Sequence, residues 1–184
     1  MNHIEKLQRL ILKQSFQYDE TAPFKLSSGV LSQFYFDCKK TTLDPEGAYL
    51  IGEILYERAK NMPISGCGGL TLGADPLAAT LMCTAYFTDR KKIPQFIVRK
   101  KLKEHGTKKW IEGPLEPSVR APVLVLDDVV TTGKSVIDAI ERLKEDGFDI
   151  YGVIVLVDRE ECGGMDKIRQ ALPGKPVNAL ITRT

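Results

Sequence analysis

The stretch Val123-Leu-Val-Leu-Asp-Asp-Val-Val-Thr-Thr-Gly-Lys-Ser135 decides the fold of this chain. Residues 123–126 form an unbroken apolar run rich in valine, which is typical of a strand covered on both faces in a parallel sheet. Two carboxylates, Asp127 and Asp128, follow where we expect that strand to end. After the polar turn, apolar residues recur at helical spacing at Val136, Ile137, Ile140 and Leu143. A strand, a turn and a helix in this order bring backbone N–H groups to the carboxyl edge of a sheet, where they can bind a phosphate.

The acidic pair indicates which kind of phosphate this turn would bind. A Walker A loop needs glycine at position 128, but the chain has Asp128, whose carboxylate would repel a polyphosphate. A ribose 5-phosphate suits the pattern better, because carboxylates accept hydrogen bonds from its 2′- and 3′-hydroxyls while the Thr-Thr-Gly turn binds its phosphate. The alternative is an ordinary buried strand whose acids cap a helix, which explains one aspartate more easily than two. The stretch resembles the phosphoribosyl-pyrophosphate (PRPP) binding loop of the type I phosphoribosyltransferases.

Length and composition set limits on the class of protein. The chain has 184 residues, of which 43% are hydrophobic and 27% charged, as expected for one globular domain. A formal net charge of +2 gives no sign of a nucleic-acid or anionic-membrane partner. The N-terminus lacks a signal-peptide pattern, and no apolar run approaches the ~20 residues of a membrane span. The four cysteines are far apart and only two histidines occur, so we expect no zinc site or disulfide framework, and a cytoplasmic location.

The remaining pattern predicts a parallel α/β sheet. Apolar spacing predicts a helix over 3–15, and Asp44-Pro45 begins a second helix that reaches about residue 60. An antiparallel hairpin is expected from residues 24–30 and 33–37. Further strands are expected at 63–69, 93–98, 123–127, 150–157 and 179–181, and another helix begins at Asp75-Pro76. Strands and helices alternate from Asp44 onward, which places ligands at the carboxyl ends of the strands.

A basic segment, Arg99-Lys-Lys-Leu-Lys-Glu-His-Gly-Thr-Lys-Lys109, begins where the 93–98 strand should end. It carries six Lys or Arg residues against one Glu. Such a run is usually a solvated loop, and nucleic-acid binding is a rival use, although aromatic residues do not interleave it. Because it leaves the same sheet edge as the acidic pair, we expect a mobile loop that closes over a pyrophosphate leaving group.

This loop narrows the resemblance to one family. Its Arg-Lys-x-x-Lys-x-His-Gly pattern resembles the catalytic loop of orotate phosphoribosyltransferase. Residues 24–29 and 34–36 are similar to the hood that covers the base in that family, and Val157-Asp-Arg159 is similar to its orotate-binding segment. The resemblance implies the type I phosphoribosyltransferase fold, in which a mainly parallel central sheet is flanked by helices and carries a small N-terminal hood. It implies a single domain over 1–184, with a hood of roughly 16–40 plus the N-terminal helix, and a core of roughly 44–184.

The resemblance also implies roles for individual residues. The residues implied in catalysis are Lys103, His105, Asp127 and Asp128. Pyrophosphate would contact Arg99, Lys100, Lys103 and His105, with the loop 99–114 shared across a homodimer interface. The ribose hydroxyls would bind Asp127 and Asp128, and the 5-phosphate would bind Val129, Val130, Thr131, Thr132, Gly133, Lys134 and Ser135. Orotate would contact Thr131 and Arg159. Mg²⁺ would be held largely by substrate oxygens and water, with Asp127 and Asp128 as the only candidate protein ligands.

Two positions depart from the family pattern. Many members have a hood lysine where this chain has Ser27, so one phosphate or base contact is either missing or supplied by Lys25 instead. Many members also have a lysine in the loop after the second strand, whereas residues 68–75 contain no basic residue and could bind pyrophosphate only through amides and hydroxyls. The Gly68-Gly69 pair in this segment is equally well explained as a tight turn.

The function implied by the resemblance is pentosyl transfer from PRPP to orotate, which gives orotidine 5′-monophosphate and pyrophosphate in de novo UMP synthesis. A purine phosphoribosyltransferase and a non-catalytic PRPP-sensing regulator are the alternatives. The basic segment disfavours the regulator, because sensing would not require a pyrophosphate clamp. From the length of 184 residues we expect no fused decarboxylase domain.

Overall fold

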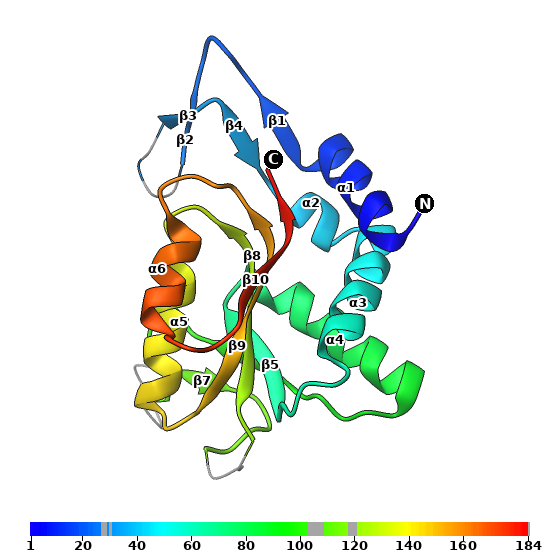
Figure 1. Ribbon diagram of the computed structural model, residues 1–184, viewed down its shortest axis with the longest axis vertical. Coiled ribbons are helices and arrows are strands. Elements are labelled where there is room, and N and C mark those ends of the chain that lie inside the picture. The colour runs from blue at the N-terminus through cyan, green and yellow to red at the C-terminus, as the bar shows by residue number, and fades with distance from the viewer. Residues whose placement is uncertain (27–28, 30, 103–108, 118–120, 184) are drawn as a thin grey trace.

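The computed structural model describes residues 1–26, 29, 31–102, 109–117 and 121–183 (Figure 1). Within these residues the central sheet has the strand order β10-β9-β8-β5-β6-β7. The parallel strands are β5 (Gly66–Leu70), β6 (Gln95–Val98), β8 (Val123–Val130), β9 (Ile150–Asp158) and β10 (Val177–Thr182). The short strand β7 (Ile111–Glu112) pairs antiparallel with β6 at one edge, and the sequence pattern did not predict it. The predicted parallel α/β sheet is confirmed.

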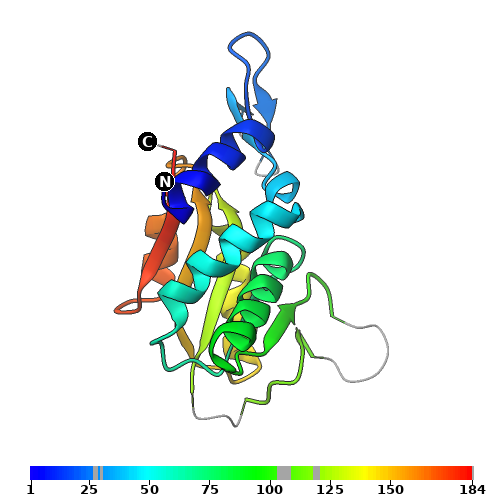
Figure 2. The same cartoon turned by 90° about the vertical axis from the view of Figure 1, so that its right-hand side faces the viewer.

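Helices cover both faces of this sheet. One face is covered by α1 (His3–Gln14), α3 (Pro45–Ala59) and α4 (Ala74–Asp89), and the other by α5 (Lys134–Glu145) and α6 (Gly164–Ala171) (Figures 1 and 2). The start of α3 is as predicted, since the Asp44 side chain accepts hydrogen bonds from the N–H groups of Glu46 and Gly47. Helix α6 and the four-residue helix α2 (Lys39–Thr42) were not expected from the sequence.

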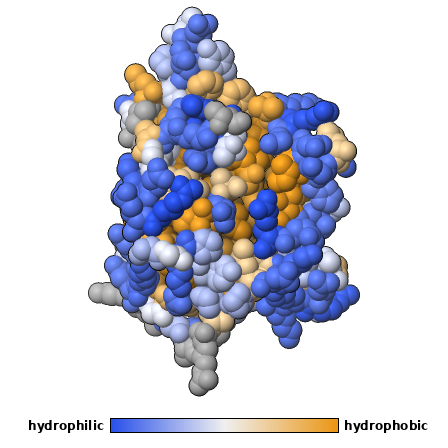
Figure 3. Space-filling view, in the orientation of Figure 1, coloured by the Kyte–Doolittle hydropathy of each residue, from blue (hydrophilic) through white to orange (hydrophobic). Residues whose placement is uncertain are grey.

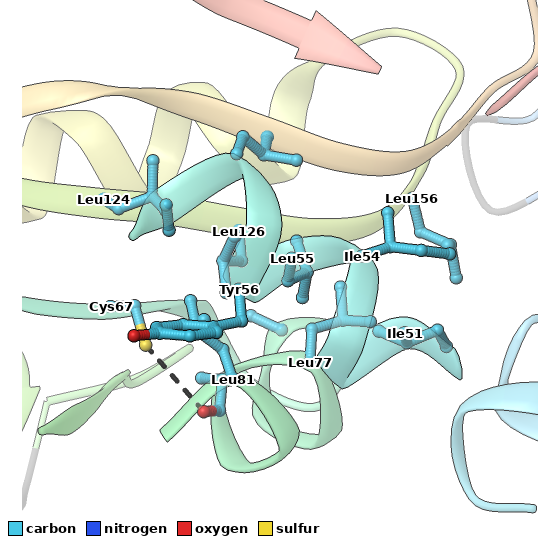
Figure 4. Close-up of a cluster of buried hydrophobic side chains, with 14 of the residues drawn as sticks. Ile51, Ile54, Leu55, Tyr56, Cys67, Leu77, Leu81, Leu124, Leu126 and Leu156 are labelled. Carbon is cyan, nitrogen blue, oxygen red and sulfur yellow. Dashed lines mark hydrogen bonds between the residues drawn. The ribbon is translucent and has the colours of Figure 1, made fainter. Parts of the chain in front are cut away.

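Alternating residues of β8 build the two halves of the core. Leu124 and Leu126 pack towards α3 and α4, where they meet Leu55, Leu77 and Leu81 (Figure 4). Val123 and Val125, which alternate with these leucines, belong to the cluster under α5 and α6. Burial of each such side chain stabilises the fold by about 1.5–3 kcal/mol. The uninterrupted apolar run is therefore explained by a strand that is covered on both faces.

Strand β8 is longer than the sequence predicted. It does not end at Asp127 but continues to Val130, because Asp127, Val129 and Val130 pair with Val155, Val157 and Asp158 of β9. The two aspartates therefore belong to a rigid strand rather than to a loop. Backbone pairing outweighed the low strand preference of aspartate.

The tight turn considered for Gly68-Gly69 is also wrong, because both residues lie inside β5. A Cβ atom on Gly68 would lie 2.0 Å from the carbonyl oxygen of Phe96, and one on Gly69 would lie 2.2 Å from that of Leu126. Glycine is required here by the close approach of neighbouring backbones. Because β5 continues to Leu70 and α4 begins at Ala74, the connection between them consists of residues 71–73.

The hood projects from the carboxyl side of the sheet (top of Figure 1). Its predicted hairpin is only partly right. Strand β2 (Phe24–Lys25) pairs with β3 (Leu31–Ser32), while β4 (Phe34–Phe36) pairs with β1 (Phe16–Tyr18), a strand the sequence pattern did not predict. Aromatic contacts explain this second pairing. The ring centroid of Phe16 lies 6.0 Å from that of Phe34 and 5.1 Å from that of Phe36.

Figure 3 shows an apolar area in the middle of one face, bordered by hydrophilic surface. In Figure 1 the same region lies between β10 and the helices α1 and α3. A groove of about 660 Å³ occurs there, lined by Ile11, Leu12, Phe34 and Ile181 among others. In the described part of the chain, no helix combines the length and the apolar character needed to cross a membrane.

Candidate active site

A cleft of about 400 Å³ lies at the carboxyl ends of β5, β8 and β9, beneath the hood. Lys25 and Tyr35 line it from the hood and Lys39 from α2. Residues 70–73 line it between β5 and α4. The floor is formed by the end of β8, with Asp127 and Asp128, and by Arg159 just after β9. The tertiary structure thus brings the predicted acidic pair and the predicted base-binding arginine into one cavity.

The two carboxylates at the floor differ in environment. Asp127 is 5% exposed, and its Oδ1 accepts a hydrogen bond of 3.1 Å from the N–H of Asp128. Asp128 Oδ1 accepts one of 2.9 Å from the N–H of Val129, and its Oδ2 lies 3.7 Å from Nζ of Lys39. Burial, reinforced by the adjacent Asp128 charge, raises the pKa of Asp127 to about 8. At neutral pH this shift favours the protonated form of Asp127 in the ligand-free protein. The ammonium group of Lys39 faces the side chain of Asp128.

The connection 71–73 packs directly over this acidic pair. A Cβ atom on Gly73 would lie 2.5 Å from Oδ1 of Asp128 and 2.8 Å from Oδ1 of Asp127. The Thr71 hydroxyl donates a 2.6 Å hydrogen bond to Asp75, which anchors the start of α4. The peptide bond between Thr71 and Leu72 is cis. Only glycine allows the backbone to approach the two carboxylates this closely.

A second hollow of about 250 Å³ adjoins the cleft at the N-terminus of α5. All seven residues predicted to bind the 5-phosphate, 129–135, line it. Gly133 has a φ of 77°, in the left-handed region, and a Cβ atom there would lie 2.7 Å from the carbonyl oxygen of Gly164. The turn thus needs glycine, and it leaves the first N–H groups of α5 available to an anion. The phosphate-binding role of these residues stays a prediction.

Arg159 is held in the cleft wall by the hood. Its side chain is 3% exposed, and Nη2 donates hydrogen bonds to Ser32 Oγ at 3.0 Å and to the carbonyl oxygen of Phe34 at 2.6 Å. The same nitrogen lies 2.9 Å from the carboxylate of Glu161. Its Nε is buried and has no hydrogen-bond partner among the described residues. A buried N–H without a partner costs about 1–3 kcal/mol, which a ligand acceptor in the cleft would recover.

The base of the basic segment is anchored. The Arg99 N–H donates to the carbonyl oxygen of Trp110 at 2.9 Å, and its guanidinium lies 3.1 Å from Glu112. Arg142 donates to the carbonyl oxygen of Arg99 at 2.8 Å and stacks 4.5 Å over the Trp110 ring. Lys100 lines the cleft, and its contact with pyrophosphate stays a prediction. Lys103 and His105 lie outside the described residues, as does Ser27 of the hood.

Sequence reasoning missed two residues of this site. Lys39 is the first residue of a helix too short to show a periodic pattern, so no local signal identified it. Glu161 follows Arg159 by two residues, and an Arg-x-Glu pair beside a predicted site could have been noticed. The cleft now combines an acidic pair, a helix N-terminus, three lysines and a buried arginine. That set of groups suits a ligand with vicinal hydroxyls, phosphates and a separate anionic group.

Comparison with known proteins places the chain in a family. Residues 68–170 match the phosphoribosyl transferase domain family. The chain is 47% identical to the orotate phosphoribosyltransferase of Aquifex aeolicus over 92% of this chain and 91% of that protein, and 38% identical to that of Sorangium cellulosum over 97% and 90%. The Mycobacterium tuberculosis orotate phosphoribosyltransferase, solved with Fe(III) dicitrate, superposes with a TM-score of 0.80 at 31% identity, covering 98% of this chain and 97% of that one. The same mycobacterial enzyme solved with PRPP superposes with a TM-score of 0.74 at 26% identity, covering 98% and 89%. The chain therefore belongs to the orotate phosphoribosyltransferases, a family of the type I phosphoribosyltransferase fold.

Proposed function

We propose that the cleft beneath the hood transfers the 5-phosphoribosyl group from PRPP to orotate, giving orotidine 5′-monophosphate and pyrophosphate on the route to UMP. The observation that carries this assignment is Arg159, a buried guanidinium whose Nε lacks a described partner, in the same cavity as the acidic pair. Orotate carries a carboxylate and ring carbonyls, and either could accept from that donor. The family membership supports the same reaction.

Different parts of PRPP would bind in the cleft and in the adjoining hollow. The ribose hydroxyls would meet Asp127 and Asp128, and the 5-phosphate would enter the 250 Å³ hollow at the start of α5. Orotate would lie beneath the hood, beside Arg159 and Thr131. The diphosphate would then lie towards Lys100 and the connection 71–73, with Lys103 and His105 approaching as the basic segment closes. Arg99 would have to exchange its contact with Glu112 for one with the diphosphate.

The reaction breaks the bond from C1 of the ribose to the diphosphate oxygen, which departs with the electron pair. The new bond joins C1 to N1 of orotate. Since N1 is nucleophilic as an anion, the protein needs no strong base. Its residues would act by positioning the two substrates and by stabilising the charge that develops on the leaving diphosphate. Closure of the basic segment would exclude water, which otherwise hydrolyses PRPP.

The site fits Mg²⁺ held mainly by substrate. Mg²⁺ prefers oxygen ligands and retains several waters. Among the described residues, no cluster of three or more His, Cys, Asp or Glu side chains could hold a metal ion. Asp127 and Asp128 offer oxygens at the cleft floor, beside the place proposed for the ribose. When bound, the ion would neutralise charge on the diphosphate.

We further propose a cytoplasmic homodimer. The free thiols of Cys38, Cys67, Cys83 and Cys162 suit a reducing compartment. Exposed apolar side chains on α4, Tyr86 and Phe87, border an apolar groove of about 500 Å³, which suits a protein contact. Light scattering would give the oligomeric state directly.

A panel of bases tests the proposed reaction. Purified protein is incubated with PRPP, Mg²⁺ and, in separate reactions, orotate, uracil, adenine, hypoxanthine or guanine, and pyrophosphate release is measured. Turnover is expected with orotate alone, because the other bases lack a carboxylate for Arg159. Turnover with a purine would assign the protein to purine salvage. Tight PRPP binding without turnover of any base would indicate a regulator.

A further inference from the structure

The cleft has an unusual distribution of charge for a site that must hold a diphosphate. The connection that covers the acidic pair, residues 71–73, is described completely and contains no basic residue. The pair itself would repel a diphosphate. Cations must therefore reach this place from other elements. Among the described residues that line the cleft, the cations are Lys25, Lys39, Lys100 and Arg159.

Three of these four cations either have another ion-pair partner or come from an element other than the one beside the acidic pair. Arg159 is buried in its pair with Glu161, and its proposed partner is the base. Lys25 belongs to the hood strand β2, and Lys100 follows β6 at the base of the basic segment. Lys39 alone of the four comes from α2, and its Nζ lies 3.7 Å from Oδ2 of Asp128. Its charge is therefore beside the acidic pair before any substrate arrives.

The backbone that carries Lys39 is fixed. Thr41 is fully buried, and its hydroxyl lies 2.7 Å from that of Ser15. A Cβ atom on Gly47 would lie 2.0 Å from the carbonyl oxygen of Thr41, so α3 packs tightly against α2. The Lys39 side chain, in contrast, is 49% exposed. A long flexible side chain on a rigid base can change partners without any movement of the backbone.

We propose that Lys39 binds the diphosphate of PRPP, in place of a cation on the connection 71–73. In the ligand-free protein Lys39 faces Asp128. When the ribose hydroxyls donate to Asp128, the ammonium group turns to the diphosphate oxygens. The ion pair is long, at 3.7 Å, and its lysine is half-exposed, so water can solvate the ammonium group as it changes partner and the exchange costs little. The proposal rests on the function proposed above and adds to it a residue that the family pattern did not indicate.

The two fragments of PRPP separate this role from a structural one. Ribose 5-phosphate probes the acidic pair and the phosphate hollow, whereas pyrophosphate with Mg²⁺ probes the leaving-group site alone. Titration calorimetry on the Lys39→Ala variant should show at least about tenfold weaker pyrophosphate binding, as for a charged hydrogen bond. Binding of ribose 5-phosphate should change less than about twofold, because Asp128 only loses a competing partner.

Lys40 supplies the matched control. It is the next residue of α2 and is exposed, so Lys40→Ala removes the same charge from nearly the same place. That variant should bind both fragments as the wild type does, and Lys39→Arg should recover much of the lost pyrophosphate affinity. Thermal unfolding of all three variants checks that they are folded.

Several results would overturn the proposal. Unchanged pyrophosphate affinity in Lys39→Ala would refute the proposal. So would an equal loss of affinity for pyrophosphate and for ribose 5-phosphate in that variant, or a loss of pyrophosphate affinity in Lys40→Ala as large as in Lys39→Ala. The function proposed above is tested separately by turnover of orotate in the wild type. A wild type that makes orotidine 5′-monophosphate, together with a Lys39→Ala variant of normal pyrophosphate affinity, would refute the role of Lys39 alone.

Discussion

Arg159 and Glu161 form an ion pair, with Nη2 of the arginine 2.9 Å from the glutamate carboxylate, and this pair connects the hood to the end of the sheet. The same carboxylate accepts a 2.9 Å hydrogen bond from the hydroxyl of Ser32 in the hood and lies 3.4 Å from the guanidinium of Arg183. Glu161 therefore holds Arg159 in one orientation, in which Nε is buried and has no hydrogen-bond partner among the described residues. Arg159 and Glu161 both contact the hood, so the proposed base site and the hood are coupled through these two side chains.

The first prediction concerns this glutamate. Glu161→Gln keeps an acceptor for Ser32 but removes the charge that orients Arg159, so the KM for orotate should rise about tenfold. The Kd for PRPP should stay within about twofold, because Arg159 does not face the ribose site. Steady-state kinetics and calorimetry measure the two values. Glu141→Gln, an exposed change on α5, is the control. Equal weakening of both substrates would show that Glu161 merely supports the fold.

Orotate binding should depend on the shape of the cation at position 159 and not only on its charge. Arg159→Ala should weaken orotate binding by roughly 10–100-fold and PRPP binding far less, because a charged hydrogen bond to the base is lost. Arg159→Lys should not restore binding, since lysine has no donor at the position of Nε. Isothermal titration with each substrate distinguishes the cases. Full recovery by lysine would contradict the role assigned to Nε.

Asp128→Asn should leave the fold intact, because the amide oxygen can still accept from the N–H of Val129. PRPP binding should fall by at least about tenfold, since a neutral acceptor binds the ribose hydroxyls more weakly than a carboxylate does. Thermal unfolding and PRPP titration measure the two effects. PRPP affinity equal to that of the wild type would refute the ribose-hydroxyl assignment.

The raised pKa of Asp127 predicts how stability depends on pH. The folded protein keeps this proton up to about pH 8, whereas the unfolded chain loses it near the ordinary value of 3.8. Between these values the folded state binds more protons, so the free energy of unfolding falls as pH rises. The stability that Asp127 contributes is fully present below pH 3.8, the pKa in the unfolded chain, and is lost by about pH 8.

Asp127→Asn tests this because asparagine stays neutral and keeps the acceptor for the N–H of Asp128. The Tm of the variant should exceed that of the wild type by at least about 3 °C near pH 9, and the difference should shrink towards pH 4. Thermal scans of the ligand-free proteins across this range measure it. Parallel curves would show that folding does not raise the pKa of Asp127.

The proposed sharing of the basic segment between subunits can be tested by complementation. A Lys103→Ala chain and an Asp128→Asn chain should each be nearly inactive alone. After subunit exchange, each heterodimer would have one doubly defective site and one intact site, so about a quarter of the wild-type activity should return. Native mass spectrometry verifies the exchange. A mixture that has exchanged but stays inactive would place Lys103 in the site of its own subunit.

The sequence by itself determined the class of fold and the position of the main site. The run 123–126 is short, rich in valine and apolar at every position, which favours a strand covered on both faces over a helix. The caps at Asp44-Pro45 and the turn at Gly133 were also readable, since each depends on contacts only a few residues apart. The local chemistry of the acidic pair and the phosphate turn is likewise a property of neighbouring residues.

Only the tertiary structure decided what depends on contacts between distant segments. β8 extends through Asp127 and Asp128 because β9 pairs with it, and β4 pairs with β1 because their aromatic rings meet. Lys39 reaches the acidic pair, and Glu161 orients Arg159, because α2 and the hood are folded against the sheet edge. No period or motif encodes such neighbours, since the free energy that selects them comes from packing across the whole domain.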